Sequence, residues 1–115
     1  MPPREYRFRI QDIFNAIEDI ELFSSRLTNL DDFKGNKMAF YATLKALEII
    51  GEAAHHIPNE IKEKYNDVPW IILKDFRNKL SHEYFGIDPQ IVWGAIKTEL
   101  PFLKKQIQKI LQEIS

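Results

Sequence analysis

The sequence predicts an all-α fold, a four- to five-helix up-and-down bundle. Apolar residues recur at spacings of three and four along most of the chain, which is the period of an amphipathic helix. Only four glycines and six prolines interrupt its 115 residues, and the prolines stand where helices can begin or bend. No alternating apolar and polar run lies between hairpin turns, so nothing favours strands.

The first half of the chain predicts two long helices. The first, of about 20 residues, carries its apolar stripe on Tyr6, Ile10, Ile13, Ile17 and Ile20. A polar stretch over 24–36 follows, in which no helix is predicted. The second helix ends at about His56, and its stripe is Phe40, Leu44, Leu47, Gly51 and Ala54. The small residues at its far end permit another helix to approach closely.

Prolines mark the helices of the second half. Pro58 opens a short helix that runs through Tyr65, and Pro69 opens the next one. That helix, WIILKDFRNKLSHEY, is expected to bury Ile72, Leu73, Phe76 and Leu80 and to stop at Gly86. Asp88 can cap a last segment with Pro89 at its first position. Pro101 is expected to kink this segment or to split it in two.

Composition narrows the function classes. The length fits a single domain over residues 1–115, and 44% hydrophobic with 29% charged residues is ordinary for a globular protein. No apolar run is long enough for a membrane span and no secretory signal is visible, so a cytoplasmic protein without a membrane partner is expected. The absence of cysteine excludes disulfides and thiolate sites. A net charge of −1 leaves nucleic-acid binding to a local basic patch.

The decapeptide FRNKLSHEYF, at 76–85, gathers the polar groups of greatest chemical interest. On a helix, Asn78 and His82 share one face and Arg77 and Ser81 share the neighbouring one, with Tyr84 two turns from Arg77. Arg77 and His82 are separated by about 140° in direction at 100° per residue. A second copy of the helix across a dimer axis would remove this separation, because it would place two arginines and two histidines around one groove.

These residue types suit phosphate chemistry. Histidine can take and give a proton near neutral pH, and arginine offers a charged planar fork to phosphate oxygens. In RNA the 2′-hydroxyl is a built-in nucleophile, so a base and a cation suffice for cleavage without a metal or another cofactor. The alternative is a helix C-terminus at which Arg77, Lys79 and His82 only complement the helix dipole.

The same residues resemble the HepT-like proteins of the HEPN superfamily, which are toxins of bacterial and archaeal toxin–antitoxin pairs. The family hallmark is R-x-x-x-x-H-x-Y with a polar residue after the arginine, matched here by Arg77, Asn78, His82 and Tyr84. Three blocks occur in the family's order: LEIIGEAAHHIP, VPWIILKDFRNKLSHEYFGID, and VW followed by LPFLKKQI. The resemblance covers nearly the whole chain and is loosest over 23–37.

The resemblance implies a dimer that cuts RNA, either tRNA or mRNA, at a composite site in its interface. It implies that Arg77 stabilises the phosphorane, that His82 acts as general base or acid, and that Asn78 orients the substrate or the histidine. A minimal nucleotidyltransferase of the MntA type is the implied antitoxin. It would attach adenylyl groups to Tyr84 and so block the groove with phosphate and bulk.

Two alternatives stay open at this stage. A non-catalytic module would present the same basic groove to RNA, to a nucleotide or to the nucleotidyltransferase without cutting. Glu48, Glu52, His55 and His56 include one Glu-x-x-His element of the kind used in dimetal bundles, but no second such element completes a site. Glu52 can instead hold the Arg77 guanidinium in a bidentate pair, and both Glu52 and Ser81 are expected to support the site.

Overall fold

The computed structural model describes residues 6–83 and 86–114, and all regular elements in these ranges are helices. They are α1 (Tyr6–Ser24), α2 (Leu30–Lys34), α3 (Lys37–His55), α4 (Asn59–Lys64), α5 (Trp70–Glu83), α6 (Pro89–Lys97) and α7 (Glu99–Ile114). The expected all-α class is confirmed. None of these helices is both long enough and apolar enough to cross a bilayer.

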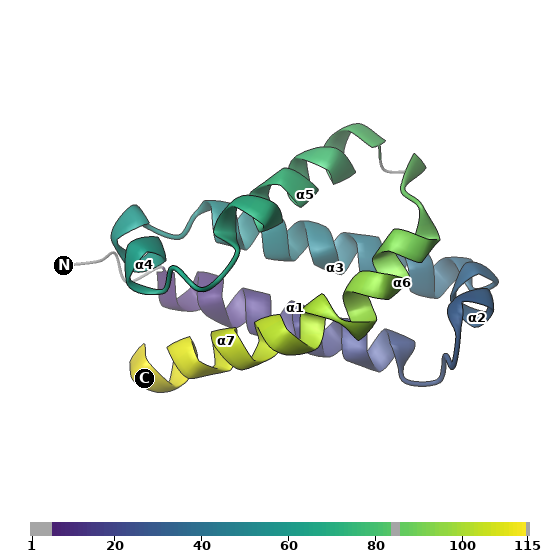
Figure 1. Cartoon of the computed structure of the whole chain (residues 1–115), viewed down its shortest axis with the longest axis horizontal. Helices are drawn as coiled ribbons and strands as arrows, with labels where there is room; N and C mark the ends of the chain where they lie inside the picture. Colours follow the sequence, from purple (N-terminus) through teal and green to yellow (C-terminus); the bar gives the residue numbers. More distant parts are fainter. Residues whose placement is uncertain (1–5, 84–85, 115) are drawn as a thin grey trace.

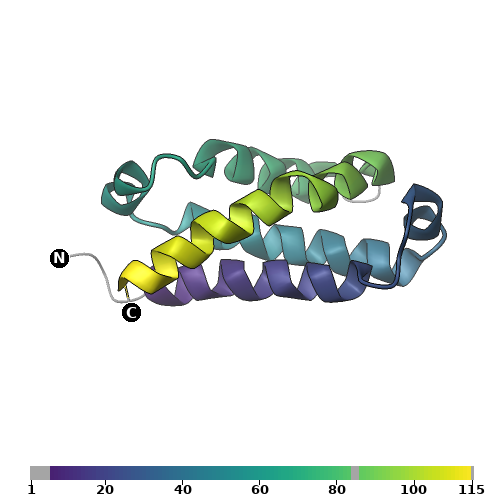
Figure 2. The ribbon, with the colours of Figure 1, turned by 60° about the horizontal axis from the view of Figure 1, so that its bottom comes forward.

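The long helices form an up-and-down bundle. α1 packs against α3, α3 against α5, and α1 against α7, while α6 continues into α7 along the last side (Figures 1 and 2). The core between them is formed by apolar side chains that are almost completely excluded from solvent, among them Ile10, Ile13, Ile17, Ile20, Leu44, Ile50, Leu80, Val92, Ile107 and Ile110. The stripes of α1 and α3 therefore face one common core, as predicted. On α5 the prediction holds for Leu80, which is fully buried, but is wrong for Ile72, which is 66% exposed because it lies on the rim of a groove beside α5.

Several boundaries follow from local chemistry. The Asp88 side chain accepts a hydrogen bond from the backbone N–H of Gln90 at 2.9 Å, and Pro89 is the first residue of α6, as predicted. The last segment is split, but the break lies at Thr98 and Pro101 sits in the first turn of α7. A proline is tolerated there because its missing N–H would have no partner within the helix.

Two predictions about short helices were inexact. Pro58 is the residue before α4 rather than its first residue, and α4 ends at Lys64. The polar stretch was expected to be without a helix but contains α2, which begins where the Asn29 side chain accepts a hydrogen bond from the N–H of Asp32 at 2.9 Å. Five residues are too few for an apolar period, and α2 buries only Phe33.

Gly51 sets the separation between α3 and α5. A Cβ atom at this position would lie 2.5 Å from the Cβ of Arg77 and 3.0 Å from the carbonyl oxygen of Leu73. The absence of a side chain therefore lets the two helices approach at the start of the polar motif, as the small residues of α3 predict. This contact places the backbone of Arg77 directly against α3.

Candidate active site

The polar motif occupies the second half of α5, on the outside of the bundle. Arg77 is half-buried, with 27% of its side chain exposed, whereas Asn78, Ser81 and His82 are exposed. Tyr84, the residue expected to be adenylylated, lies outside the described residues. The motif therefore combines one anchored cation with polar side chains that face solvent.

Glu52 anchors this cation. Its Oε2 atom accepts a hydrogen bond from Nε of Arg77 at 2.5 Å, across the close contact between α3 and α5. The predicted facing of Glu52 and Arg77 is confirmed, but the pair has one contact rather than the bidentate pair that was expected. Among the described residues, the hydrogen bond between Arg77 and Glu52 uses Nε alone, which leaves the N–H groups of the two terminal nitrogens to bind a phosphate.

His56 explains the single contact, and sequence reasoning had given this residue no such role. Its Nε2 atom lies 2.9 Å from Oε1 of Glu52, so the carboxylate bridges His56 and Arg77. Hydrogen bonding to His56, and then to Arg77, lowers the pKa of Glu52 below its usual value. The four-residue spacing of Glu52 and His56 on one helix was the available signal.

The same bridge bears on the metal alternative. Both oxygens of Glu52 are engaged by protein side chains, and the ring of His55 packs edge-on against His56 at 5.2 Å between centroids. No group of three or more histidine and carboxylate side chains with the geometry of a metal site occurs among residues 6–83 and 86–114. The cluster in this structure is an anchor for arginine.

His82 and Ser81 are placed differently from Arg77. α5 continues without a break through Arg77 and His82, so the two side chains leave the helix about 140° apart. The Ser81 hydroxyl donates to the carbonyl oxygen of Arg77 at 3.2 Å, which satisfies the helix backbone. Within one chain, the structure thus unites Arg77 with Glu52 and leaves His82 on the outer face of α5.

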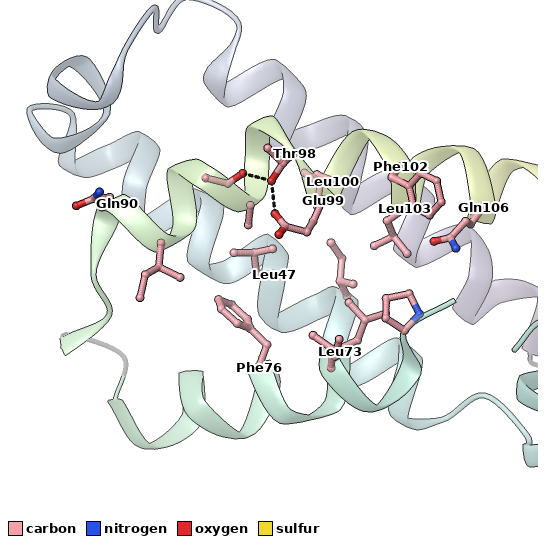
Figure 3. Close-up of a pocket in the computed structure, with 16 residues that line it drawn as sticks. Leu47, Leu73, Phe76, Gln90, Thr98, Glu99, Leu100, Phe102, Leu103 and Gln106 are labelled. Atoms are coloured by element: carbon pink, nitrogen blue, oxygen red, sulfur yellow. Dashed lines mark hydrogen bonds between the residues drawn. The ribbon is translucent and has the colours of Figure 1, made fainter. Parts of the chain in front are cut away.

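A large apolar groove lies on the other side of α5. Its volume is about 660 Å³, and it opens between α5 and the α6–α7 rod with α3 as its floor (Figure 3). Leu47, Leu73, Phe76 and Leu103 line it. Its rim includes Ile72, Ile91 and Phe102, which are 66%, 53% and 65% exposed. Exposed apolar side chains around a groove are typical of a surface that another molecule covers.

Comparison with known proteins finds relatives along nearly the whole chain. The family model described as "Ribonuclease HepT-like" matches residues 13–110. A Methanocaldococcus jannaschii protein named "Putative RNase MJ1216" is 40% identical over 114 residues, which are 99% of this chain and 93% of that protein. "Probable ribonuclease HepT" of Thermococcus cleftensis is 38% identical over 107 residues, 93% of this chain and 96% of that protein. No solved structure gives a significant match.

These matches span the helices that build the core and the site, from α1 to α7. They include Glu52, Arg77 and His82, all of which lie inside the matched range. The chain therefore belongs to the HepT-like ribonuclease family of the HEPN superfamily.

Proposed function

We propose that this protein is a metal-independent endoribonuclease, the toxin of a toxin–antitoxin pair, which cuts RNA at a composite site between two copies of the chain. The observation that carries the proposal is the arginine of the motif, which Glu52 holds through Nε alone among the described residues, on the same helix as an exposed histidine. This is the pair of groups that cleavage through a 2′-hydroxyl requires.

The roles follow from the reaction. The 2′-oxygen attacks the adjacent phosphorus as His82 removes its proton, the bond from phosphorus to the 5′-oxygen breaks, and that oxygen gains a proton as it leaves. A cyclic phosphate and a 5′-hydroxyl result. Arg77 stabilises the negative charge of the phosphorane through its terminal nitrogens, and Asn78 orients the substrate or the histidine. The proposed substrate is tRNA or mRNA, in the cytoplasm.

A homodimer completes this site. Arg77 and His82 of one chain point about 140° apart. The arginine of one copy therefore acts together with the histidine of the other copy. The exposed face of α5 also carries Ile71 and Ile72, which are 75% and 66% exposed. Together with the rim of the groove, these side chains give a second copy an apolar surface to cover.

Regulation is proposed to act through Tyr84. A partner of the minimal nucleotidyltransferase type would attach adenylyl groups to its hydroxyl, and the added phosphates would compete with RNA for Arg77. Mass spectrometry after co-expression with a minimal nucleotidyltransferase of the MntA type should find a mass increase of one or more adenylyl groups on the peptide that contains Tyr84. An unmodified peptide beside an active partner and ATP would contradict this part of the proposal.

Cleavage in the presence of EDTA tests the activity. The purified protein is expected to cut bulk RNA or tRNA to fragments with cyclic phosphate ends, and Arg77→Ala and His82→Ala to slow cutting by roughly 10²- to 10⁴-fold. Arg26→Ala, which removes an exposed arginine from the turn after α1, is the matched control and should cut like the parent. Equal activity of all four proteins would place the reaction elsewhere or identify a contaminant.

One observation favours a second candidate. Because a single chain does not bring His82 to Arg77, its basic face by itself fits a binding module for RNA or for the nucleotidyltransferase. Such a module would protect bound RNA from an added nuclease and leave no new ends. Protection without cleavage, by a protein shown to be dimeric and unmodified at Tyr84, would replace the first proposal with this one.

A further inference from the structure

A group of cations extends from Arg77 toward the beginning of α5. Lys74 precedes Arg77 by three residues, so the two side chains lie on neighbouring parts of the same helix face. Lys62 of α4 lies close enough to Lys74 for the two positive charges to repel each other. His55 of α3 likewise lies within range of the electrostatic interaction with Arg77 and Lys74. Two helices, α4 and α5, thus contribute cations to one stretch of surface, and His55 of α3 lies beside them.

The pKa values of Lys62 and His55 are both affected by their surroundings. Partial burial, and then the charge of Lys74, lowers the pKa of Lys62 below its usual value. Partial desolvation, and then the charge of Arg77, likewise lowers the pKa of His55. In both groups desolvation is the larger cause and a neighbouring cation is the second, so these side chains lie near other positive charges on a chain whose overall net charge is −1.

Few carboxylates balance these cations. Glu52 forms an ion pair with Arg77, but no described carboxylate lies within ion-pair distance of Lys62 or Lys74. The acidic neighbours in sequence, Glu63 and Asp75, each follow a lysine directly and so point about 100° away around the helix. The residues three and four positions before and after each lysine, which would be its neighbours on a helix face, include no acidic residue. Within the described part of the chain, these two lysines therefore lack an ion-pair partner, and Arg77 is paired through Nε alone.

We propose that Lys62 and Lys74 form, with Arg77, a phosphate track that holds the RNA backbone on one side of the phosphate to be cut. This proposal rests on the proposed function, because it takes Arg77 as the contact to the reacting phosphate. The track leads from Arg77 along the first turns of α5 to α4, at the end of the molecule opposite α2 (Figure 1). It contacts phosphates alone, so it favours longer single strands without selecting a sequence.

The test compares two charge-matched double variants of the full chain. Lys62→Gln with Lys74→Gln removes the track, and Lys34→Gln with Lys37→Gln removes two exposed lysines at the α2 end. The binding probe is a fluorescein-labelled single-stranded oligodeoxynucleotide, which carries phosphates but no 2′-hydroxyl and so cannot be cut by the proposed reaction. Affinity is measured by anisotropy over a series of salt concentrations.

The track variant is expected to bind roughly tenfold more weakly than the parent at low salt. The slope of log affinity against log salt concentration should also be less steep by about 1.4, which is about 0.7 for each of the two lost phosphate contacts. The control variant should keep the parent's slope. Equal changes in the two variants, or no measurable binding by the parent, would overturn the track.

Cleavage provides a readout that separates the track from the reaction. A dinucleoside monophosphate has one phosphate and cannot reach the track, so the track variant should cut it at the parent's rate and lose activity only on longer RNA. A parent that cuts nothing, with the slope difference intact, would reject the proposed function and keep the track. Equal cutting of long RNA by the track variant and the parent would reject the track and keep the function.

Discussion

Glu52 holds two side chains at once, and in the proposed function its contact with Arg77 supports cleavage. Glu52→Gln keeps the shape of the side chain but removes the charge that orients the guanidinium. We expect kcat to fall by about tenfold with KM little changed, because the orientation of Arg77 matters most when charge develops on the phosphorane. Steady-state cleavage of a defined RNA measures both constants.

Glu48→Gln is the matched control for this variant. Glu48 lies one turn earlier on α3, and its ion pair in this structure is with Lys45. This substitution removes the same charge from the same helix without touching Arg77. An equal loss of kcat in both variants would mean that general charge near the site, and not the anchoring of Arg77, supports the reaction.

The pKa of Glu52 predicts how stability depends on pH. Hydrogen bonding to His56, and then to Arg77, holds this pKa below the usual 4.5, so the folded protein binds the proton less tightly than the unfolded chain. The stabilisation is complete above the usual pKa and is lost as pH falls through the lowered value. Urea unfolding should show Glu52→Gln less stable than the parent at pH 7, and the difference should shrink progressively as the pH falls below 4.5. A constant difference would show that the effect is not electrostatic.

At the scale of elements, replacing glycine by alanine is predicted to have opposite effects on stability at Gly51 and at Gly94. Gly51→Ala should destabilise the protein by about 1–3 kcal/mol, because its Cβ would lie 2.5 Å from the Cβ of Arg77 and 3.0 Å from a backbone oxygen. Gly94→Ala in α6 meets nothing within 4 Å and should stabilise by up to about 1 kcal/mol, since alanine is the better helix former. Chemical unfolding of both variants checks the pair, and a stabilising Gly51→Ala would contradict the close contact.

Tyr65 ties the end of α4 to α7. Its hydroxyl donates to Oε2 of Glu113 at 2.5 Å, and burial together with this carboxylate raises the pKa of Tyr65 to about 12. Tyr65→Phe should cost about 1–2 kcal/mol of folding free energy. In the parent, an absorbance titration should show one late phenol, and this variant should lose that step. A parent in which all phenols titrate near pH 10 would contradict the contact.

Local chemistry explains which parts of the fold and site the sequence predicts. The Asp88 cap and the contact at Gly51 are visible because a single residue type carries each of them. α2 was missed because its signal lies in a capping asparagine and not in apolar spacing. The expected bidentate pair of Glu52 and Arg77 was wrong because His56 occupies the second oxygen, and a competing partner cannot be read from one spacing alone.

For the whole molecule, the open groove predicts self-association. α5 and the α6–α7 rod face each other across it, and Ile72 on its rim is 66% exposed. We expect light scattering to show that the parent is a dimer at micromolar concentration. Its melting temperature should also rise with protein concentration, because only folded chains associate into the dimer. Ile72→Asp should give a monomer, since it would bury an unpaired charge in the interface.

Leu22→Asp provides the matched control for the dimer, because Leu22 is 70% exposed on α1, a helix that contributes nothing to the groove. It should remain dimeric and keep the parent's activity. The composite site predicts that Ile72→Asp loses cleavage together with dimerisation, although Arg77, His82 and Glu52 are all intact. A folded Ile72→Asp monomer that still cuts RNA at the parent's rate would show that one chain suffices, and that Arg77 reaches His82 by a movement of its own helix.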